Sequence, residues 1–267
     1  TRYLARVAEV LQRHSAASCS ELVVYSAALG DNFAATTFAE RDLAGALPKK
    51  ALWHANGRNC YFRFVLTTDL SAKKRDSSLL LERLVPLDPA RLPYPKHEMR
   101  RNVKVLKMIG HKIFHWAKRT VWIDAKLRIG SIDPREYFAS RVERFGVCAS
   151  YMGLPVHDNA FGEGHLDRPS LKRHGENIMN AAARRPSVTD NIGVVGAQIG
   201  HYAPRDKKYS PSLVDTAYIA RDFSSPRCRA FNNAFGCTWF DEIDCFSDRD
   251  QLSFPAAVRR LALTQPD

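Results

Sequence analysis

A short apolar run that ends in a carboxylate, VWIDAK at residues 121–126, offers the first chemistry in this chain. The pattern predicts a buried strand that delivers Asp124 to the carboxyl end, where ligands bind in open α/β folds. Residues two apart in an extended stretch project to the same side, so Asp124 and Lys126 can face one ligand. The Lys126 ammonium would neutralise a diphosphate as a point charge. Asp124 would accept hydrogen bonds from a hydroxyl or hold a metal. A surface ion pair between the two is the alternative.

A second group of polar residues follows the aromatic pair Trp239 and Phe240 near the C-terminus. Its members are Glu242, Asp244, Asp248, Asp250 and Gln251. Carboxylates and amides exchange hydrogen bonds with hydroxyl groups, and aromatic faces stack on sugar rings, so the group suits carbohydrate binding. One carboxylate could also act as the base that deprotonates an acceptor hydroxyl. The structural alternative is a capping box, in which Ser247 and Asp250 open a helix.

Other chemistries find less support in the sequence. His111 and His115 lie four residues apart on a predicted helix and could bind a metal, but we interpret them as an exposed basic pair. The chain contains no G-x-S-x-G elbow, P-loop, H-E-x-x-H or G-x-G-x-x-G motif. The six cysteines form no C-x-x-C pair, so we expect buried thiols. One or two disulfides are the alternative in an oxidising lumen.

The elements that must position these residues alternate between strand and helix. Apolar runs rich in β-branched and aromatic residues predict strands at 21–29, 60–69, 81–88, 120–124 and 214–222. Helical periodicity predicts helices at residues 1–14, at about 99–114, from Asp133–Pro134 onward and at the C-terminus. The run at 194–203 reads as either a helix or a strand. This rhythm favours an α/β layer fold.

The domain organisation that we expect is simple. No linker rich in Gly and Ser divides the chain, so we predict a single domain over residues 1–267, with a loop-rich insertion at about 146–190. No stretch reaches the roughly 18 apolar residues that a membrane-spanning helix needs. Because the chain starts at Thr1, a membrane anchor outside this chain stays an alternative.

The charge of the chain favours an anionic partner. Lys+Arg number 40 against 28 Asp+Glu, a formal net charge of +12. Basic residues concentrate in residues 96–119, which also carry three histidines and a single acid. Phosphorylated small molecules, acidic polysaccharides and membrane surfaces fit such a segment, and a solvated helix face is the alternative. We expect no nucleic acid, since aromatic residues are sparse there and no zinc-finger or RNA-recognition signature occurs.

Two long stretches together resemble one known family. They are residues 99–129, MRRNVKVLKMIGHKIFHWAKRTVWIDAKLRI, and residues 237–254, CTWFDEIDCFSDRDQLSF. They are similar to the plant mucilage-related hexosyltransferase family, long catalogued as a domain of unknown function. Its motifs run approximately R-N-G-K-x-P-K-x-x-x-H-x-x-F, W-I-D-G-K and W-x-E-I-x-x-F-S-x-R-D-Q-L-S-F. Weaker similarities lie at Gly30–Asn32, Gln198 and Tyr202, and the family-like core covers about 21–254.

The resemblance implies an α/β fold of the GT-A-like Rossmann type, a sandwich with a central mixed, mostly parallel sheet. It also implies a glycosyltransferase of polysaccharide biosynthesis that binds a nucleotide-sugar donor, first of all a UDP-sugar, and transfers the sugar to a glycan acceptor, acidic in one alternative. The residues that match the donor-binding motifs are Arg101, Asn102, Lys104, Lys107, His111, Asp124, Lys126 and Arg249. The family's C-terminal motif is matched by Glu242, Asp250 and Gln251. Glu242 is the candidate base, and Asp250 and Gln251 form the pair that positions the sugar.

Departures from the family pattern leave several points open. Val103, Leu106 and Ala125 replace Gly, Pro and Gly of the family motifs. Two alternatives remain for the diphosphate. Either Asp124 helps to hold a divalent cation, Mn²⁺ or Mg²⁺, or Lys126 takes the place of that metal. Whether transfer retains or inverts the anomeric configuration of the sugar stays open. The resemblance allows a Golgi lumen or a cytoplasmic location. A lipid amidase or hydrolase and a non-catalytic binder of acidic glycans are the competing functions.

Overall fold

A computed structural model describes residues 2–17, 19–29, 59–70, 82–125, 138–143, 147–152, 171–184, 191–202 and 215–264. The chain divides into two compact units. The first unit comprises Thr1–Ser150 and Ala217–Asn233, and the second comprises Tyr151–Thr216 and Ala234–Asp267. Each unit therefore combines segments that are distant in the sequence. The single domain expected from the sequence stays a prediction.

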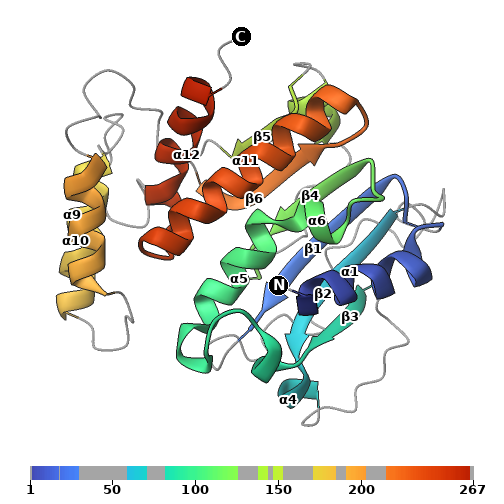
Figure 1. Ribbon diagram of the computed structural model, residues 1–267, viewed down its shortest axis with the longest axis horizontal. Coiled ribbons are helices and arrows are strands. Elements are labelled where there is room, and N and C mark those ends of the chain that lie inside the picture. The colour runs from blue at the N-terminus through green and yellow to red at the C-terminus, as the bar shows by residue number, and fades with distance from the viewer. Residues whose placement is uncertain are drawn as a thin grey trace. The chain divides into compact units, whose positions relative to one another are not determined.

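A six-stranded sheet orders the strands as β3-β2-β1-β4-β6-β5 (Figure 1). The strands are β1 Leu22–Ala28, β2 Asn59–Leu66, β3 Glu82–Leu87, β4 Arg119–Ile123, β5 Ala149–Met152 and β6 Asp215–Asp222. Strand β1 pairs in parallel with β2 and β4, and β2 pairs in parallel with β3. Strand β4 pairs antiparallel with β6. The predicted α/β class with a mixed, mostly parallel Rossmann-like sheet is confirmed, as are the strands expected at these positions.

Aromatic side chains form the core between the sheet and its helices in the first unit. Every residue of β1 is buried, as expected for a central strand of a parallel sheet. The Tyr25 ring lies 5.0 Å from Phe114 and 5.3 Å from Trp122, measured between centroids, and Phe62 lies 5.3 Å from Phe114. Such tilted and edge-on contacts add to the area that each ring buries. Strands β1, β2 and β4 are thereby joined to the segment that follows the helices.

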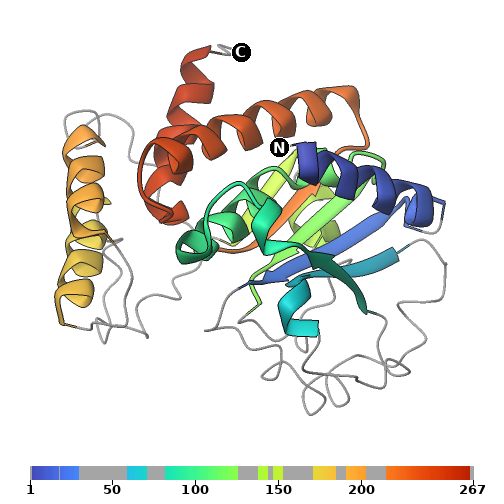
Figure 2. The ribbon, with the colours of Figure 1, turned by 60° about the horizontal axis from the view of Figure 1, so that its bottom comes forward.

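The helices of the first unit confirm the predicted amphipathic elements. They are α1 Arg2–Ser15, α4 Thr67–Leu70, α5 Met99–Met108 and α6 Gly110–Ile113, with short 3₁₀ turns at Pro89–Arg91 and Lys96–Glu98. Figures 1 and 2 show α1, α5 and α6 on one side of the sheet, where α1 contacts α6 and α5 contacts β1. The helix expected from Asp133–Pro134 begins outside the described residues, and a π-helical turn, Ala139–Glu143, follows.

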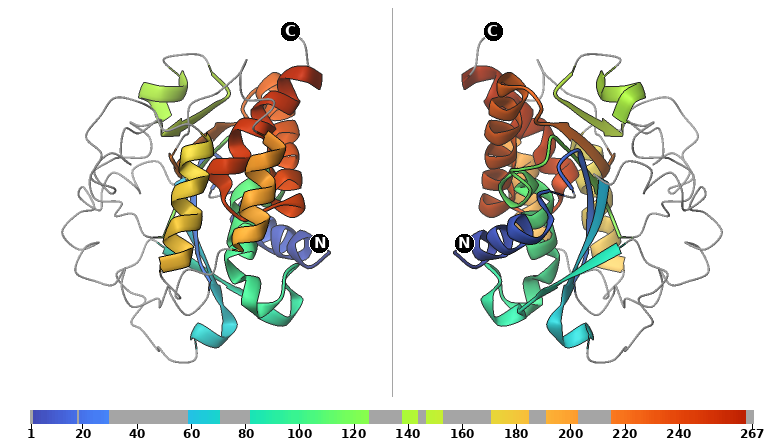
Figure 3. Two further views of the ribbon diagram at one scale, coloured as in Figure 1. Left: turned by 90° about the vertical axis from the view of Figure 1, so that its left-hand side faces the viewer. Right: turned by 90° about the vertical axis from the view of Figure 1, so that its right-hand side faces the viewer.

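The second unit consists mainly of helices. These are α9 Leu171–Arg184, α10 Ile192–Tyr202, α12 Asp250–Thr264 and the part of α11 (Pro226–Cys245) that starts at Ala234. Helices α9 and α10 lie side by side (Figure 3), and a Cβ atom on Gly175 would come within 2.1 Å of the Ile199 side chain. Glycine therefore permits this close approach. Ile178, Val195, Ile199, Tyr202 and Leu252 form the shared core.

Two expectations for these segments need correction. The region at 146–190, predicted to be loop-rich, contains β5 and the 14-residue helix α9. Within α9 the buried residues His174 and Ile178 lie four apart, a helical spacing that the surrounding polar, Gly-, His- and Pro-rich sequence obscured. Residues 226–245 form one 20-residue helix, α11, where the sequence indicated only an aromatic cluster and an acidic stretch. No helix in the described ranges is long and apolar enough to cross a membrane.

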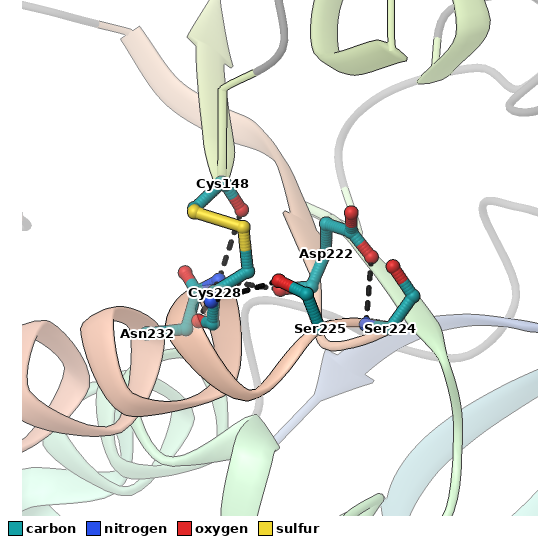
Figure 4. The surroundings of a disulfide bond; sticks show 6 residues. All are labelled: Cys148, Asp222, Ser224, Ser225, Cys228 and Asn232. Atoms are coloured by element: carbon teal, nitrogen blue, oxygen red, sulfur yellow. Dashed lines mark hydrogen bonds between the residues drawn. A yellow bond between two sulfur atoms is a disulfide. The ribbon is translucent and has the colours of Figure 1, made fainter.

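Disulfides replace the buried thiols that the sequence suggested. Cys19 bonds to Cys60 and Cys148 bonds to Cys228, while Cys237 and Cys245 form no disulfide. The second bridge ties the start of β5 to the first turn of α11 (Figure 4). The Asn232 amide reinforces it by donating to the carbonyl oxygens of Cys148 at 2.9 Å, Asp222 at 2.8 Å and Cys228 at 3.1 Å. Bridges of this kind are typical of oxidising compartments.

We predict that replacing both Cys148 and Cys228 by serine lowers the free energy of unfolding by about 2–5 kcal/mol, because an 80-residue loop is no longer closed in the unfolded chain. Denaturant unfolding measures the change. The matched control replaces Cys237 and Cys245, which form no disulfide, by serine and should leave stability nearly unchanged. Equal losses in the two double variants would contradict the assignment of the bridge.

Candidate functional site

Asp124 lies one residue beyond β4, at the carboxyl end of that strand. Its backbone N–H donates to the carbonyl of Ala217 at 2.7 Å, which extends the β4–β6 ladder by one position. Its Oδ1 accepts hydrogen bonds from Lys107 Nζ at 3.1 Å and from Trp122 Nε1 at 2.7 Å. The side chain keeps 20% of its surface exposed. The structure thus places Asp124 where the sequence predicted, and Lys126 lies outside the described residues.

Lys107 is wholly buried, with a side-chain exposure of 0%. Its ammonium forms the ion pair with Asp124 and lies 5.7 Å from the centroid of the Trp122 ring, within range of a cation–π contact. The resemblance assigned Lys107 to donor binding, and that role stays a prediction, whereas the structure shows its ammonium turned inward. A buried ammonium is retained only with a partner, because an unpaired charge in the interior costs about 3–5 kcal/mol.

The other donor-motif residues of α5 divide into partly exposed and buried positions. Arg101 is partly exposed, pairs with Glu98 at 3.1 Å and lies over the Tyr94 ring at 5.1 Å. Lys104 is also partly exposed. Asn102 is 1% exposed and brackets Tyr94, accepting from its N–H at 3.1 Å and donating to its carbonyl at 2.8 Å. Asn102 therefore fixes the chain before α5 and does not face solvent.

His111 lies inside the protein, which corrects the expectation of an exposed histidine pair. Its exposure is 4%, whereas His115 is exposed and contacts the Gln12 side chain at 3.1 Å. Burial, followed by the charges of Arg221 and Lys112, lowers the pKa of His111 from 6.5 to about 3. The imidazole is consequently neutral at physiological pH. It supplies no positive charge to a ligand.

Tyr25 links the buried cations to the α5–α6 junction. Its hydroxyl donates to the carbonyl oxygen of Lys107 at 3.4 Å and accepts from Arg221 Nη1 at 3.2 Å. Burial raises the pKa of Tyr25 despite the two nearby cations. A Cβ atom on Gly110 would lie 1.9 Å from the hydroxyl oxygen. Only glycine fits here, so the break between the helices and the position of Lys107 depend on one close contact.

In the second unit, Glu242 is the centre of a buried hydrogen-bond network. It is 6% exposed, accepts a short hydrogen bond from the Tyr202 hydroxyl, and pairs with Arg260 Nη1 at 2.8 Å. Burial and the bond to Glu242 raise the pKa of Tyr202 well above 10. Gln198 joins the network, donating to Tyr202 at 3.4 Å and accepting from Ser247. The two weaker similarities noted in the sequence, Gln198 and Tyr202, thus meet at Glu242.

The neighbouring motif residues also have internal partners. Asp250 is 6% exposed and accepts from the Thr216 hydroxyl at 2.6 Å. The Gln251 amide lies 3.1 Å from the His174 ring, and Arg249 is partly buried. The predicted helix begins at Asp250, whose carboxylate accepts from Thr216. The Ser247 hydroxyl donates to Gln198 and accepts from the backbone N–H of Arg249 at 3.4 Å.

Trp239 does not form the predicted platform for a sugar ring. It is wholly buried and packs against Phe235 at 5.4 Å and Phe254 at 5.1 Å between centroids. Its indole N–H donates to the Ser253 hydroxyl at 2.9 Å. A tryptophan does contact the candidate site in the first unit, where the Trp122 indole N–H donates to the Asp124 carboxylate. The spacing of Trp122 and Asp124, two residues apart on one side of a strand, was the signal for that contact.

The described residues contain no group of three or more His, Cys, Asp or Glu side chains that could hold a metal ion. Divalent cations such as Mg²⁺ and Mn²⁺ require several oxygen ligands. At Asp124, one carboxylate oxygen already accepts two N–H donors, one of them a cation. The residues that the structure describes around Asp124 therefore do not fit a metal site.

The Rossmann-like sheet defines an α/β protein, and the carboxylate after strand β4 stands at the sheet edge where ligands bind in such folds. The chain belongs to the TOD1/MUCI70 family, glycosyltransferase-like domain, whose model matches residues 12–157 and 188–266. The family predicted from the motifs is thereby confirmed. The unmatched residues, 158–187, lie within the segment predicted as an insertion.

One curated relative is the Arabidopsis thaliana protein "Probable hexosyltransferase MUCI70". The chain is 26% identical to it over 227 residues, which cover 80% of this chain and 35% of that protein. The chain thus spans about a third of the length of this relative.

We predict that Gly110→Ala destabilises the protein by at least about 1–3 kcal/mol, since Tyr25 is wholly buried between aromatic rings and cannot move aside. Gly200→Ala is the matched control, because a Cβ atom there meets nothing within 4 Å. The control should be neutral or slightly stabilising. Denaturant unfolding of both variants measures the difference, and equal stabilities would show that the close contact is absent.

We predict that His111 makes the protein sensitive to mild acid. Below pH 6.5 the unfolded chain binds a proton that folded His111, with a pKa of about 3, does not bind. Stability is therefore lost as pH falls below 6.5, by up to about 1.4 kcal/mol per pH unit. Thermal unfolding between pH 7.5 and 5.0 should show a weaker pH dependence in His111→Gln. The exposed control, His115→Gln, should behave as the unsubstituted protein, and identical slopes in all three would refute the prediction.

Proposed function

We propose that this chain is a glycosyltransferase that moves a sugar from a nucleotide-diphosphate sugar, first of all a UDP-sugar, to a hydroxyl group of a glycan. The observation that carries the proposal is the carboxylate Asp124 at the carboxyl end of β4, in a chain whose family is glycosyltransferase-like. Because the chain covers 35% of its curated relative, that protein's printed activity supports the proposal and no more.

The chemistry of sugar transfer explains which residues we assign to the donor. The leaving diphosphate gains negative charge as the glycosidic bond breaks, and fixed positive charges lower the energy of that state. Arg101 and Lys104 lie three residues apart on α5 and keep exposed surface, so we assign the diphosphate to them, together with Lys126. Asp124 accepts hydrogen bonds from hydroxyl groups of the ribose or the sugar. The basic excess of +12 adds attraction for an anionic donor or an acidic acceptor.

For the second unit we propose roles that follow the family motif. Gln251, which is partly exposed, contacts the sugar with Asp250 as its neighbour, and Arg249 contributes charge. Glu242 is the candidate base or acceptor contact. Because Tyr202 and Arg260 both bind its carboxylate, Glu242 must exchange one of them before it accepts a proton from an acceptor hydroxyl. A GT-A-like arrangement of the nucleotide site is part of the same proposal.

The two disulfides indicate the kind of compartment in which we propose that the protein works. Disulfides form and persist in the secretory pathway and are rare in the cytosol. The Cys19–Cys60 and Cys148–Cys228 bridges therefore support a lumenal location, of which the Golgi is one, over a cytoplasmic one.

We predict that Asp124→Asn lowers turnover by about 100-fold, since an amide oxygen is a weaker acceptor for the hydroxyl groups that the carboxylate holds in the transition state. Release of the nucleotide diphosphate from a panel of UDP- and GDP-sugars, with neutral and acidic oligosaccharides as acceptors, measures turnover. The control is Asp241→Asn, an exposed carboxylate of α11 with full expected activity. Absence of turnover and of thermal stabilisation by every nucleotide sugar tested would overturn the proposed function.

A further inference from the structure

The ion pair between Lys107 and Asp124 brings together a cation without access to solvent and a carboxylate that retains it. The ammonium lies 3.1 Å from Oδ1 with 0% side-chain exposure, against 20% for Asp124. A buried ammonium cannot reach a ligand in solvent. Its effect on a ligand must therefore pass through Asp124, which makes Lys107 a positioning residue.

The position of the ammonium is determined by groups that do not face the ligand. The Tyr25 hydroxyl donates to the carbonyl oxygen of Lys107, and Gly110 leaves just enough room for that hydroxyl. On the other side, the Trp122 indole donates to the same carboxylate oxygen at 2.7 Å and its ring lies 5.7 Å from the ammonium. Oδ1 is thus held by two donors from two elements, α5 and β4. The carboxylate cannot turn without breaking both contacts.

We propose that Lys107 is the internal counter-cation of Asp124: it holds this carboxylate as a hydrogen-bond acceptor for the hydroxyl groups of a sugar nucleotide and prevents a divalent metal ion from binding there. A metal ion on this carboxylate would stand within a few ångströms of a fixed positive charge that has no solvent to screen it. It would also have to displace a charge-assisted hydrogen bond. The ligand part of the inference rests on the proposed function, whereas the metal part does not.

The pairing also separates two kinds of positive charge in the family motif. Arg101 and Lys104 keep exposed surface and can meet a diphosphate, whereas Lys107, one turn further along α5, neutralises a side chain of the protein itself. The net charge of the Lys107–Asp124 pair is zero. Donor binding then depends on hydrogen bonds at the pair and on charge at the exposed residues.

The first test needs no substitution. The affinity of UDP, measured by calorimetry, should change less than twofold between buffer with EDTA and buffer with Mn²⁺. A loss of tenfold or more in EDTA would overturn the inference. If UDP does not bind in either buffer, the UDP-sugar part of the proposed function fails. The metal part is then decided by titrating the protein with Mn²⁺ and following free Mn²⁺ by electron paramagnetic resonance. Stoichiometric Mn²⁺ binding that Asp124→Asn abolishes would overturn the metal part of the inference. Absence of such Mn²⁺ binding supports it.

Variants of Lys107 test the positioning role. Lys107→Met leaves the Asp124 carboxylate without its cationic partner and should lower the melting temperature by about 10 °C. The double variant Lys107→Met with Asp124→Asn should recover at least half of that loss. Lys107→Arg keeps the charge and should retain UDP affinity better than Lys107→Met. The control is Lys112→Met, an exposed lysine of α6 with no assigned role. If Lys107→Met binds UDP as tightly as Lys107→Arg, Lys107 does not position the site. If Lys107→Met fails to fold, UDP binding to Lys107→Arg is measured with and without EDTA. Binding that EDTA does not change supports the inference, and binding that EDTA weakens overturns it.

Discussion

The buried ion pair between Lys107 and Asp124 constrains the first unit more than any other contact. An ammonium in the interior must keep its partner, so α5 can occupy only positions that bring Lys107 to the end of β4. The aromatic seam of Tyr25, Phe114 and Trp122 fills the space around this contact. Gly110 allows the two helices to break where the Tyr25 hydroxyl approaches. One electrostatic requirement thus determines a helix position, a glycine and the orientation of a carboxylate.

The second unit follows the same physical logic with different residues. Its two motif carboxylates, Glu242 and Asp250, are buried and each accepts a hydrogen bond from a hydroxyl group of another element. Buried acceptors are costly unless they are satisfied, so Tyr202 and Thr216 help to hold α10 and the start of β6 in place. Motif residues in this family-like chain are therefore structural centres as well as candidates for chemistry. A substitution at either carboxylate will change stability and activity together, and the two effects need separate measurements.

The family match and the geometry support different parts of the function. Membership of the glycosyltransferase-like family rests on matches on both sides of residues 158–187, and the matched ranges include every site residue that the sequence motifs predicted. The geometry adds that the described residues near Asp124 suit a hydrogen-bonding carboxylate better than a metal ligand. The identities of the sugar and of the acceptor depend on pocket shape and on contacts to particular hydroxyl groups, which differ among proteins that share a fold.

The sequence by itself determined the strands other than β5, the main amphipathic helix and the carboxylate at the end of β4. These follow from local periodicity and from the polar residue that ends an apolar run. Only the tertiary structure decided that Lys107, His111 and Trp239 lie inside and that four cysteines pair across 41 and 80 residues. Helical spacing places a lysine on the border of the apolar face, yet whether it turns inward depends on a partner from another element. That partner, Asp124, is 17 residues away, and no local pattern contains the distance between the two side chains.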